Sequence, residues 1–186
     1  MQKAWAMWFQ RLLYLCALSA GAITLQTFCC PESRAAASVG QPAPALVVDE
    51  LDGTHFTLAD HLGQIVIVNI WATWCGPCRL EMPALDNFYR QHHGHGIEMI
   101  GLSADRPHDR KDVVTLMSAF SYPAAMLGDA HANGFGTPAV LPMTYVIGPD
   151  GIVRAQMKPS DTPITVKNLE DVVLSLTPAE PSRPSP

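Results

Sequence analysis

Cys75 and Cys78 are separated by two residues, which is the spacing of a redox-active cysteine pair. They follow an apolar run at residues 65–71, typical of a strand buried on both faces, and they open a predicted helix. Unpaired backbone N–H groups and the helix dipole favour a thiolate at a helix start, and Pro77 has no N–H to lose there. Because Cys78 lies one turn behind Cys75 on the same face, the pair can close a disulfide. We therefore predict that Cys75 attacks disulfides and that Cys78 resolves the mixed disulfide.

A Cys-x-x-Cys pair can also be half of a zinc site, but structural zinc needs four Cys or His ligands, usually in two clusters. No second cysteine pair follows, and His92, His93 and His95 lack ligand spacing, so we expect them to form a solvated turn. A purely structural disulfide would close a two-residue loop and remove little chain entropy. We therefore predict no metal and no cofactor other than the Cys75–Cys78 disulfide.

The chain resembles the TlpA/ResA group of thioredoxin-like proteins at residues 68–83, Val-Asn-Ile-Trp-Ala-Thr-Trp-Cys-Gly-Pro-Cys-Arg-Leu-Glu-Met-Pro. Proteins of this group are bacterial, are exported and face the cell envelope. The resemblance covers residues 39–176. It implies an α/β, thioredoxin-like fold, with a central mixed β-sheet flanked by helices and an N-terminal β-hairpin extension.

The same resemblance implies a catalytic role for Glu81. In the TlpA/ResA pattern a Glu at this offset lies beside the active site, where it can accept the proton of Cys78 and hold back its thiolate by charge repulsion. Ordinary thioredoxins carry a buried Asp where this chain has Asn69, so Glu81 is the better candidate for the proton acceptor. The alternative is a solvated carboxylate on the surface of the helix.

Residues 141–144, Leu-Pro-Met-Thr, resemble the cis-proline loop that faces the cysteine pair in thioredoxin-like folds. The resemblance implies a cis bond before Pro142 and a Leu141 peptide that can hydrogen-bond an extended client chain. Trp71 and Trp74 are expected mainly to pack and to shield the active site. The predicted client-binding residues are Leu141, Pro142, Trp74, Gly76 and Pro77.

Strands and helices alternate along the rest of the chain, which predicts parallel crossovers in an α/β sheet. The strand at 45–48 is followed by a hairpin signal at Asp52-Gly53. Further strands are expected at 98–103, 124–127, 141–147 and 152–157, helices over 113–120 and from Thr162-Pro163 to 176, and a loop over 128–140.

The N-terminal segment has the pattern of a secretory signal. Lys3 and Arg11 precede an apolar run at residues 12–23, and Ala35-Ala36-Ala37 offers a cleavage site after Ala37. The alternative is an uncleaved membrane anchor through residues 12–28. The predicted parts are a signal peptide or anchor (1–37), a thioredoxin-like domain (38–176) and a disordered tail (177–186).

The cysteine count and the charge fit an exported soluble domain. Cys16, Cys29 and Cys30 lie in the leader, so the only cysteines left after cleavage are the active pair. Without residues 1–37, which carry three basic residues and one acidic residue, 9 basic and 16 acidic residues remain, a net charge of −7. This charge argues against nucleic acid or anionic lipid as a partner, and we expect a monomer.

We therefore expect an exported, periplasmic thiol–disulfide oxidoreductase. Its family suggests a reductant of disulfides in envelope proteins such as apocytochromes c, with electrons supplied by a membrane thiol carrier. One alternative is a peroxiredoxin-like antioxidant protein, but that family has Thr three residues before its reactive Cys and this chain has Ala72. The other is a copper-binding chaperone, which spaces its cysteines one residue wider and adds a distant His, here His131.

Overall fold

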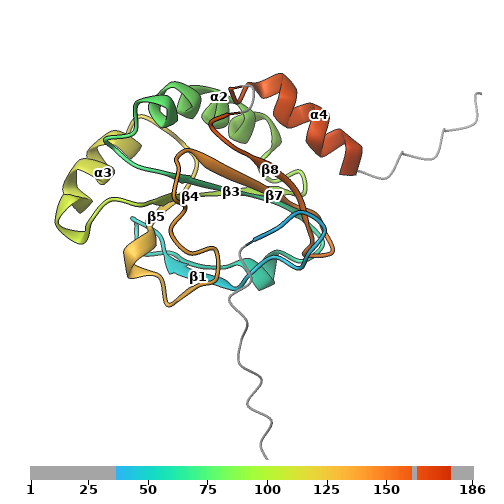
Figure 1. Ribbon diagram of the computed structural model, residues 1–186, viewed down its shortest axis with the longest axis horizontal. Helices are drawn as coiled ribbons and strands as arrows, with labels where there is room; N and C mark the ends of the chain where they lie inside the picture. Colours follow the sequence, from blue (N-terminus) through green and yellow to red (C-terminus); the bar gives the residue numbers. More distant parts are fainter. Residues whose placement is uncertain (1–36, 161–162, 177–186) are drawn as a thin grey trace, which may run out of the picture. The chain divides into compact units, whose positions relative to one another are not determined.

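The computed structural model describes residues 37–160 and 163–176, all within one unit of the chain, 34–186. The described strands include a five-stranded mixed sheet, the central sheet, in the order β5-β4-β3-β7-β8 (Figure 1). All residues of β3 (Ile65–Trp71) are buried, as its unbroken apolar run predicts. Strands β4 (Ile97–Ser103) and β5 (Ala124–Met126) run parallel to β3, whereas β7 (Met143–Ile147) is antiparallel to it. Strand β8 (Val153–Met157) completes the predicted hairpin.

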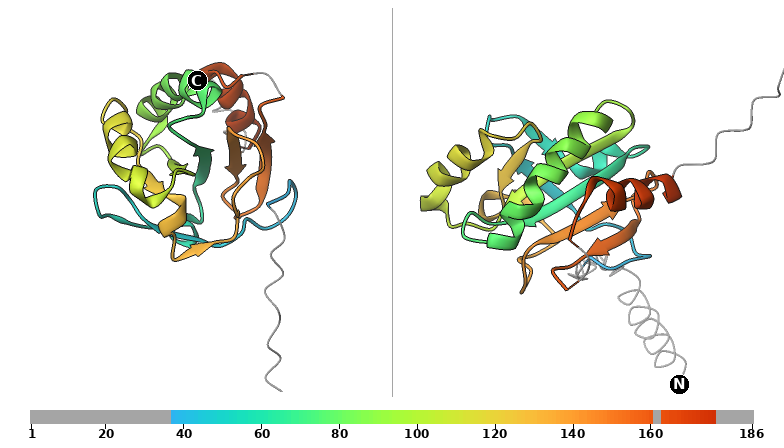
Figure 2. Two further views of the ribbon diagram at one scale, coloured as in Figure 1. Left: turned by 60° about the vertical axis from the view of Figure 1, so that its left-hand side comes forward. Right: turned by 90° about the horizontal axis from the view of Figure 1, so that it is seen from above.

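Helices cover one face of the central sheet (Figure 2). Alternate residues of β3, such as Ile67 and Trp71, meet the buried sides of these helices in one hydrophobic cluster. The chain passes from β3 through one helix to β4, and from β4 through another to β5, so the predicted parallel crossovers are confirmed. The described α-helices are α2 (Gly76–His92), α3 (Arg110–Met117) and α4 (Val166–Leu176), with short 3-10 turns η1 (Leu58–His61), η2 (Pro107–Asp109) and η3 (Leu127–Asp129).

The opposite face is covered by a small antiparallel sheet, the extension sheet, in which β2 (His55–Thr57), β1 (Leu46–Asp49) and β6 (Ala132–Asn133) lie in that order. The hairpin predicted at Asp52-Gly53 joins β1 to β2, and Gly53 has the positive φ of +93° that favours glycine. Strand β6 lies within the predicted loop 128–140. Two residues are too few to leave a periodic pattern, so the sequence did not predict β6.

The last helix begins later than predicted. Thr162 lies outside the described residues, and α4 starts at Val166. Thr165 caps it, since its Oγ1 accepts from the N–H of Asn168 at 3.2 Å while Asn168 Oδ1 accepts from the N–H of Thr165 at 2.8 Å. The prediction was wrong because the reciprocal cap, and not the proline, sets the start of this helix.

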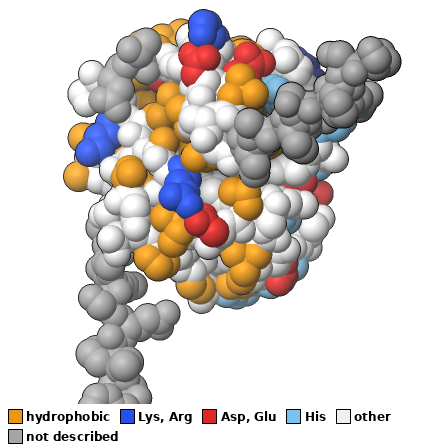
Figure 3. Space-filling view, turned by 90° about the vertical axis from the view of Figure 1, so that its right-hand side faces the viewer, with side chains coloured by type: hydrophobic (Ala, Val, Ile, Leu, Met, Phe, Trp, Pro, Cys, Tyr) orange, Lys and Arg blue, Asp and Glu red, His pale blue; other side chains and the backbone are white. Residues whose placement is uncertain are grey.

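Several charged side chains on the surface of the described residues form ion pairs. Arg154 pairs with Asp150, and Lys167 pairs with Asp171 at 2.8 Å. On the face drawn in Figure 3, Lys and Arg side chains are few and scattered, with acidic side chains beside some of them. None of the helices in the described ranges is long and apolar enough to cross a membrane. Ala37, which the predicted cleavage would remove, is buried in the cluster beneath the extension sheet.

Candidate active site

Cys75 and Cys78 form a disulfide at the N-terminus of α2, with their Cα atoms 5.3 Å apart. Cys75 is the N-cap residue, in extended backbone conformation, and its Sγ accepts from the N–H of Cys78 at 3.2 Å. The sulfur therefore occupies the place of the usual capping oxygen and satisfies one of the unpaired N–H groups of the first turn. A thiolate released at this position on reduction would meet the same N–H and the positive end of the helix dipole.

The disulfide lies below an exposed rim. Cys75 is 5% exposed and Cys78 is 1% exposed, so the atom open to attack belongs to Cys75. Around it Trp74 is 70% exposed, and Gly76 and Pro77 are exposed as well. These three residues are therefore accessible to a macromolecular partner, and their role in client binding stays a prediction.

The two predicted tryptophans differ in environment. Trp71, at the end of β3, is fully buried and packs in the same cluster as both cysteines, whereas Trp74 is largely exposed. An added Cβ on Gly101 would come within 3.0 Å of Trp71 Nε1, so the glycine on β4 leaves room for the indole. Trp71 is thus a packing residue beneath the active site, as expected.

Glu81 lies one turn after Cys78 on α2 and is half-buried. Its Oε1 accepts from the backbone N–H of Ile164 at 3.1 Å, and its Oε2 is buried with no hydrogen-bond partner among the described residues. Burial raises the pKa of Glu81, and the hydrogen bond from Ile164 opposes that rise. This environment differs from that of a solvated helix residue and suits a group that takes up a proton.

Asn69 on β3 is buried on the helix side of the central sheet. Its Nδ2 donates to Oγ1 of Thr144, directly opposite on β7, at 2.8 Å. Its Oδ1 has no partner in the part of the chain that the structure describes. An amide at this position cannot accept a proton as a carboxylate would. The carboxylate one turn after Cys78 on α2 is Glu81, which remains the candidate proton acceptor.

The predicted cis-proline loop is confirmed in geometry, since the Leu141–Pro142 peptide bond is cis. Pro142 is buried immediately before β7, and Leu141 packs against the cluster that contains Cys75 and Cys78. The fold therefore brings Leu141, from a distant part of the chain, against the same hydrophobic cluster as the cysteine pair.

Asp105 is a site residue that sequence reasoning missed. It is 4% exposed and accepts at Oδ2 from the N–H of Thr73 at 2.8 Å and from Oγ of Ser103 at 2.7 Å. Its Oδ1 accepts from Oγ1 of Thr73 at 2.6 Å. The carboxylate thus fixes the turn between β3 and Cys75. A signal existed, because β3 and β4 are parallel and polar residues after their carboxyl ends meet at one edge.

The remaining sequence candidates lie elsewhere. His131, the candidate copper ligand, bonds to Asp49 on the extension sheet, which covers the face opposite α2. His92 faces Glu170 at 3.4 Å, and His93 faces Glu98 at 3.3 Å.

Comparisons with known proteins identify the family of the chain. Residues 39–156 match the AhpC/TSA family. The thiol-disulfide oxidoreductase ResA of Bacillus thuringiensis subsp. konkukian (strain 97-27) is 31% identical over 142 residues, covering 75% of this chain and 79% of that protein. ResA of Geobacillus thermodenitrificans (strain NG80-2) is 30% identical over 122 residues, covering 65% and 70%.

Solved structures show the same fold. A thiol:disulfide interchange protein of the thioredoxin family from Chlorobium tepidum TLS superposes with a TM-score of 0.59 at 24% identity, covering 76% of this chain and 99% of that one. A secreted thiol-disulfide isomerase from Corynebacterium glutamicum gives a TM-score of 0.57 at 28% identity, covering 72% and 84%.

A mixed sheet with helices on one face and a Cys75–Cys78 disulfide at a helix start therefore defines a thiol–disulfide oxidoreductase of the thioredoxin fold. The chain belongs to the AhpC/TSA family, and its resemblance to the TlpA/ResA group is confirmed by its ResA relatives.

Proposed function

We propose that this oxidoreductase is exported to the periplasm and reduces disulfides in envelope proteins, among them those of apocytochromes c. The observation that supports the direction is Glu81, a half-buried carboxylate one turn from Cys78 with one oxygen buried and unpartnered among the described residues. The proposal includes export by the leader, which either is cleaved after Ala37 or anchors the chain through residues 12–28. Residues 12–28 lie outside the described residues, and Ala37 is the first residue that the structure describes.

The reaction transfers two electrons to the client. The thiolate of Cys75 attacks one sulfur of the client disulfide, and the other client sulfur leaves as a thiolate. Cys78 then gives its proton to Glu81 and attacks Cys75 Sγ, which releases the first client sulfur and closes the Cys75–Cys78 disulfide. A membrane thiol carrier restores the dithiol by the same exchange in reverse.

The charge of Glu81 favours a reducing rather than an oxidising protein. A negative charge disfavours a thiolate at Cys78 and so raises that thiol's pKa. A less stable reduced form means a lower reduction potential. The Gly76-Pro77 pair between the cysteines, which resembles that of reducing thioredoxins, supports the same direction.

Client binding uses the rim around Cys75. An extended client segment would hydrogen-bond the Leu141 peptide beside Pro142, in the manner of an added strand. Trp74, Gly76 and Pro77 would contact its side chains, because they are exposed around Cys75. We expect the protein to act as a monomer, without nucleic acid as a partner.

The redox potential tests this function. Equilibrating the protein with glutathione redox buffers, and measuring the fraction of Cys75–Cys78 disulfide, should give a value nearer to about −270 mV than to about −120 mV. A potential more oxidising than about −180 mV would exclude the reductase direction while leaving the oxidoreductase class intact.

A further inference from the structure

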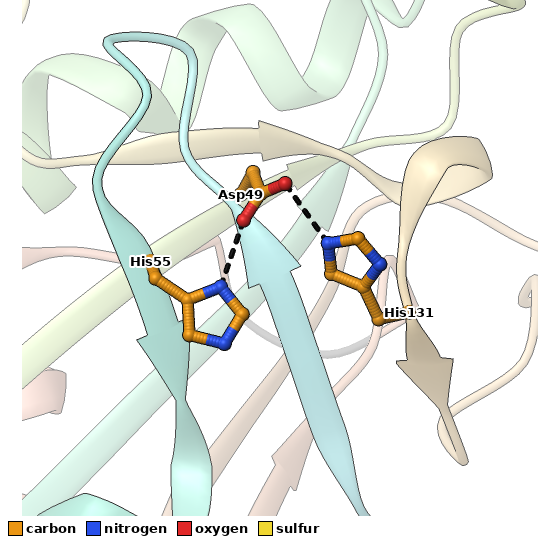
Figure 4. Close-up of side chains that lie close together, drawn as sticks. All are labelled: Asp49, His55 and His131. Atoms are coloured by element: carbon orange, nitrogen blue, oxygen red, sulfur yellow. Dashed lines mark hydrogen bonds and ion pairs between the residues drawn. The ribbon is translucent and has the colours of Figure 1, made fainter.

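Two histidines and an aspartate converge on the outer face of the extension sheet (Figure 4). Asp49 ends β1, His55 begins β2, and His131 stands immediately before β6. The carboxylate lies between the two rings, with Oδ1 2.8 Å from Nδ1 of His55 and Oδ2 2.9 Å from Nε2 of His131. The three ligand atoms lie within 4.8 Å of one another, and the rest of the described chain has no other such group of His, Cys, Asp or Glu.

Strand pairing holds these residues in place. Asp49 and His55 are direct partners across β1 and β2, and the N–H of His131 donates to the carbonyl of Val47 at 2.9 Å. Because Val48 points into the core, its neighbour Asp49 points outward. The backbone positions of all three ligands are therefore set by the sheet itself, which reduces the conformational entropy that a bound ion would have to offset.

The donor set selects the class of ion. Two imidazole nitrogens and a carboxylate oxygen suit Zn²⁺, Cu²⁺ and Ni²⁺, whereas Mg²⁺ and Ca²⁺ prefer oxygen ligands alone. Metal–ligand bonds of about 2.0–2.2 Å in a tetrahedron place ligand atoms about 3.4 Å apart. The distances between the imidazole nitrogens and the carboxylate oxygens, now 2.8 and 2.9 Å, would therefore have to increase by roughly half an ångström. The side chains can move apart in this way, because they are between 54% and 56% exposed.

We propose that Asp49, His55 and His131 bind one divalent transition-metal ion of the zinc or copper type, with solvent completing the coordination. Each imidazole would carry its proton on the nitrogen that faces away from the ion. The site is separate from the cysteine pair, because the extension sheet and α2 cover opposite faces of the central sheet. A bound ion would fasten β6 to β1 and β2, joining residues 82 positions apart.

The test is a Zn²⁺ titration, by calorimetry, of the full-length protein with Cys75 and Cys78 as the disulfide and the remaining thiols alkylated. Wild type should show one saturable site, and His55→Gln, His131→Gln and Asp49→Asn should each weaken it by at least about tenfold. His108→Gln is the matched control, because His108 also faces a carboxylate, at 3.4 Å, but lies in no such cluster of the described residues. The His108→Gln variant should bind Zn²⁺ with the affinity of wild type. Mg²⁺ should bind neither to wild type nor to His108→Gln.

Two further measurements make the result independent of folding. With Cu²⁺, electron paramagnetic resonance should show two coupled imidazole nitrogens in wild type and one in either histidine variant. Zn²⁺ should raise the Tm of wild type and His108→Gln but not of the cluster variants, whose metal-free Tm reports their folding. No saturable site in wild type, or an affinity of folded His131→Gln within about twofold of wild type, would overturn the proposal.

Discussion

Glu81 accepts a hydrogen bond from the backbone N–H of Ile164, with 3.1 Å between Oε1 and the nitrogen. The bond holds one oxygen of the carboxylate against the segment before α4, in the hydrophobic cluster that also contains both cysteines. The other oxygen is buried and has no partner among the residues described. It is therefore the atom to which the proposed mechanism gives the proton of Cys78.

Glu81→Gln should slow the reduction of a protein disulfide by about 10²–10⁴-fold, because the amide cannot accept the proton of Cys78. The fold should persist, since the amide oxygen can still accept from Ile164. The rate is measured by stopped-flow fluorescence, with Glu170→Gln as the control. Glu170 faces His92 at the opposite end of α2 from the cysteines, so its replacement should leave the rate unchanged. An unaltered rate in Glu81→Gln would show that Glu81 does not accept the proton of Cys78.

The stability of the oxidised protein should depend on pH through the same residue. Burial raises the pKa of Glu81 above its ordinary value of 4.5, so the folded protein binds this proton more tightly than the unfolded chain does. The stability contributed by Glu81 is then present below pH 4.5 and is lost as the pH rises through the folded-state pKa. Urea unfolding from about pH 4 to pH 7 should therefore show a smaller loss in Glu81→Gln than in wild type. Parallel curves would show that the proton is held no more tightly after folding.

The roles of the two cysteines can be separated by trapping. In Cys78→Ser, Cys75 can still attack a client but cannot be released, so mixed disulfides with envelope proteins should accumulate. In Cys75→Ser the residue left is the 1% exposed Cys78, and no mixed disulfide should form. Non-reducing electrophoresis of cells that express each variant gives the result. Equal trapping by both variants would contradict the order of attack.

Local patterns predicted most of this fold. The predicted strand at residues 65–71 has the same bounds as β3. Six apolar residues, interrupted only by Asn69, identify a strand that is buried on both faces. Asp52-Gly53 predicted its hairpin because the turn chemistry lies in adjacent residues. The cysteine pair at a helix start was predicted for the same reason.

What the sequence did not predict depends on residues that lie far apart in the chain. Asp105 bonds to Thr73 across 32 positions, and His131 bonds to Asp49 across 82. No local pattern links His131 to Asp49, and the signal that links Asp105 to Thr73 comes from the parallel pairing of β3 and β4, not from adjacent residues. Strand β6, which places His131, is two residues long and acquires its conformation from pairing with β1. Tertiary pairing, rather than propensity, determines such elements.

Asp105→Asn should loosen the turn that carries Cys75. The carboxylate accepts three hydrogen bonds from Thr73 and Ser103 while almost fully buried. An amide places an N–H₂ group against at least one of these donors, which should lower the free energy of unfolding by about 1–3 kcal/mol. Urea unfolding of the oxidised protein measures this loss. Because Thr73 leads directly to the active site, alkylation of Cys75 in the reduced variant should also change in rate.

Asp109→Asn is the matched control, since this aspartate lies nearby in sequence and bonds to the exposed Arg106 at 3.3 Å. An exposed ion pair of this kind contributes about 0–1 kcal/mol, so the control should unfold nearly as wild type does. If Asp105→Asn lost no more stability than Asp109→Asn and kept the wild-type alkylation rate, the turn before Cys75 would have to be held by its backbone contacts alone. The bond from the N–H of Ala104 to the carbonyl of Trp71, at 2.7 Å, would then be the contact to test next.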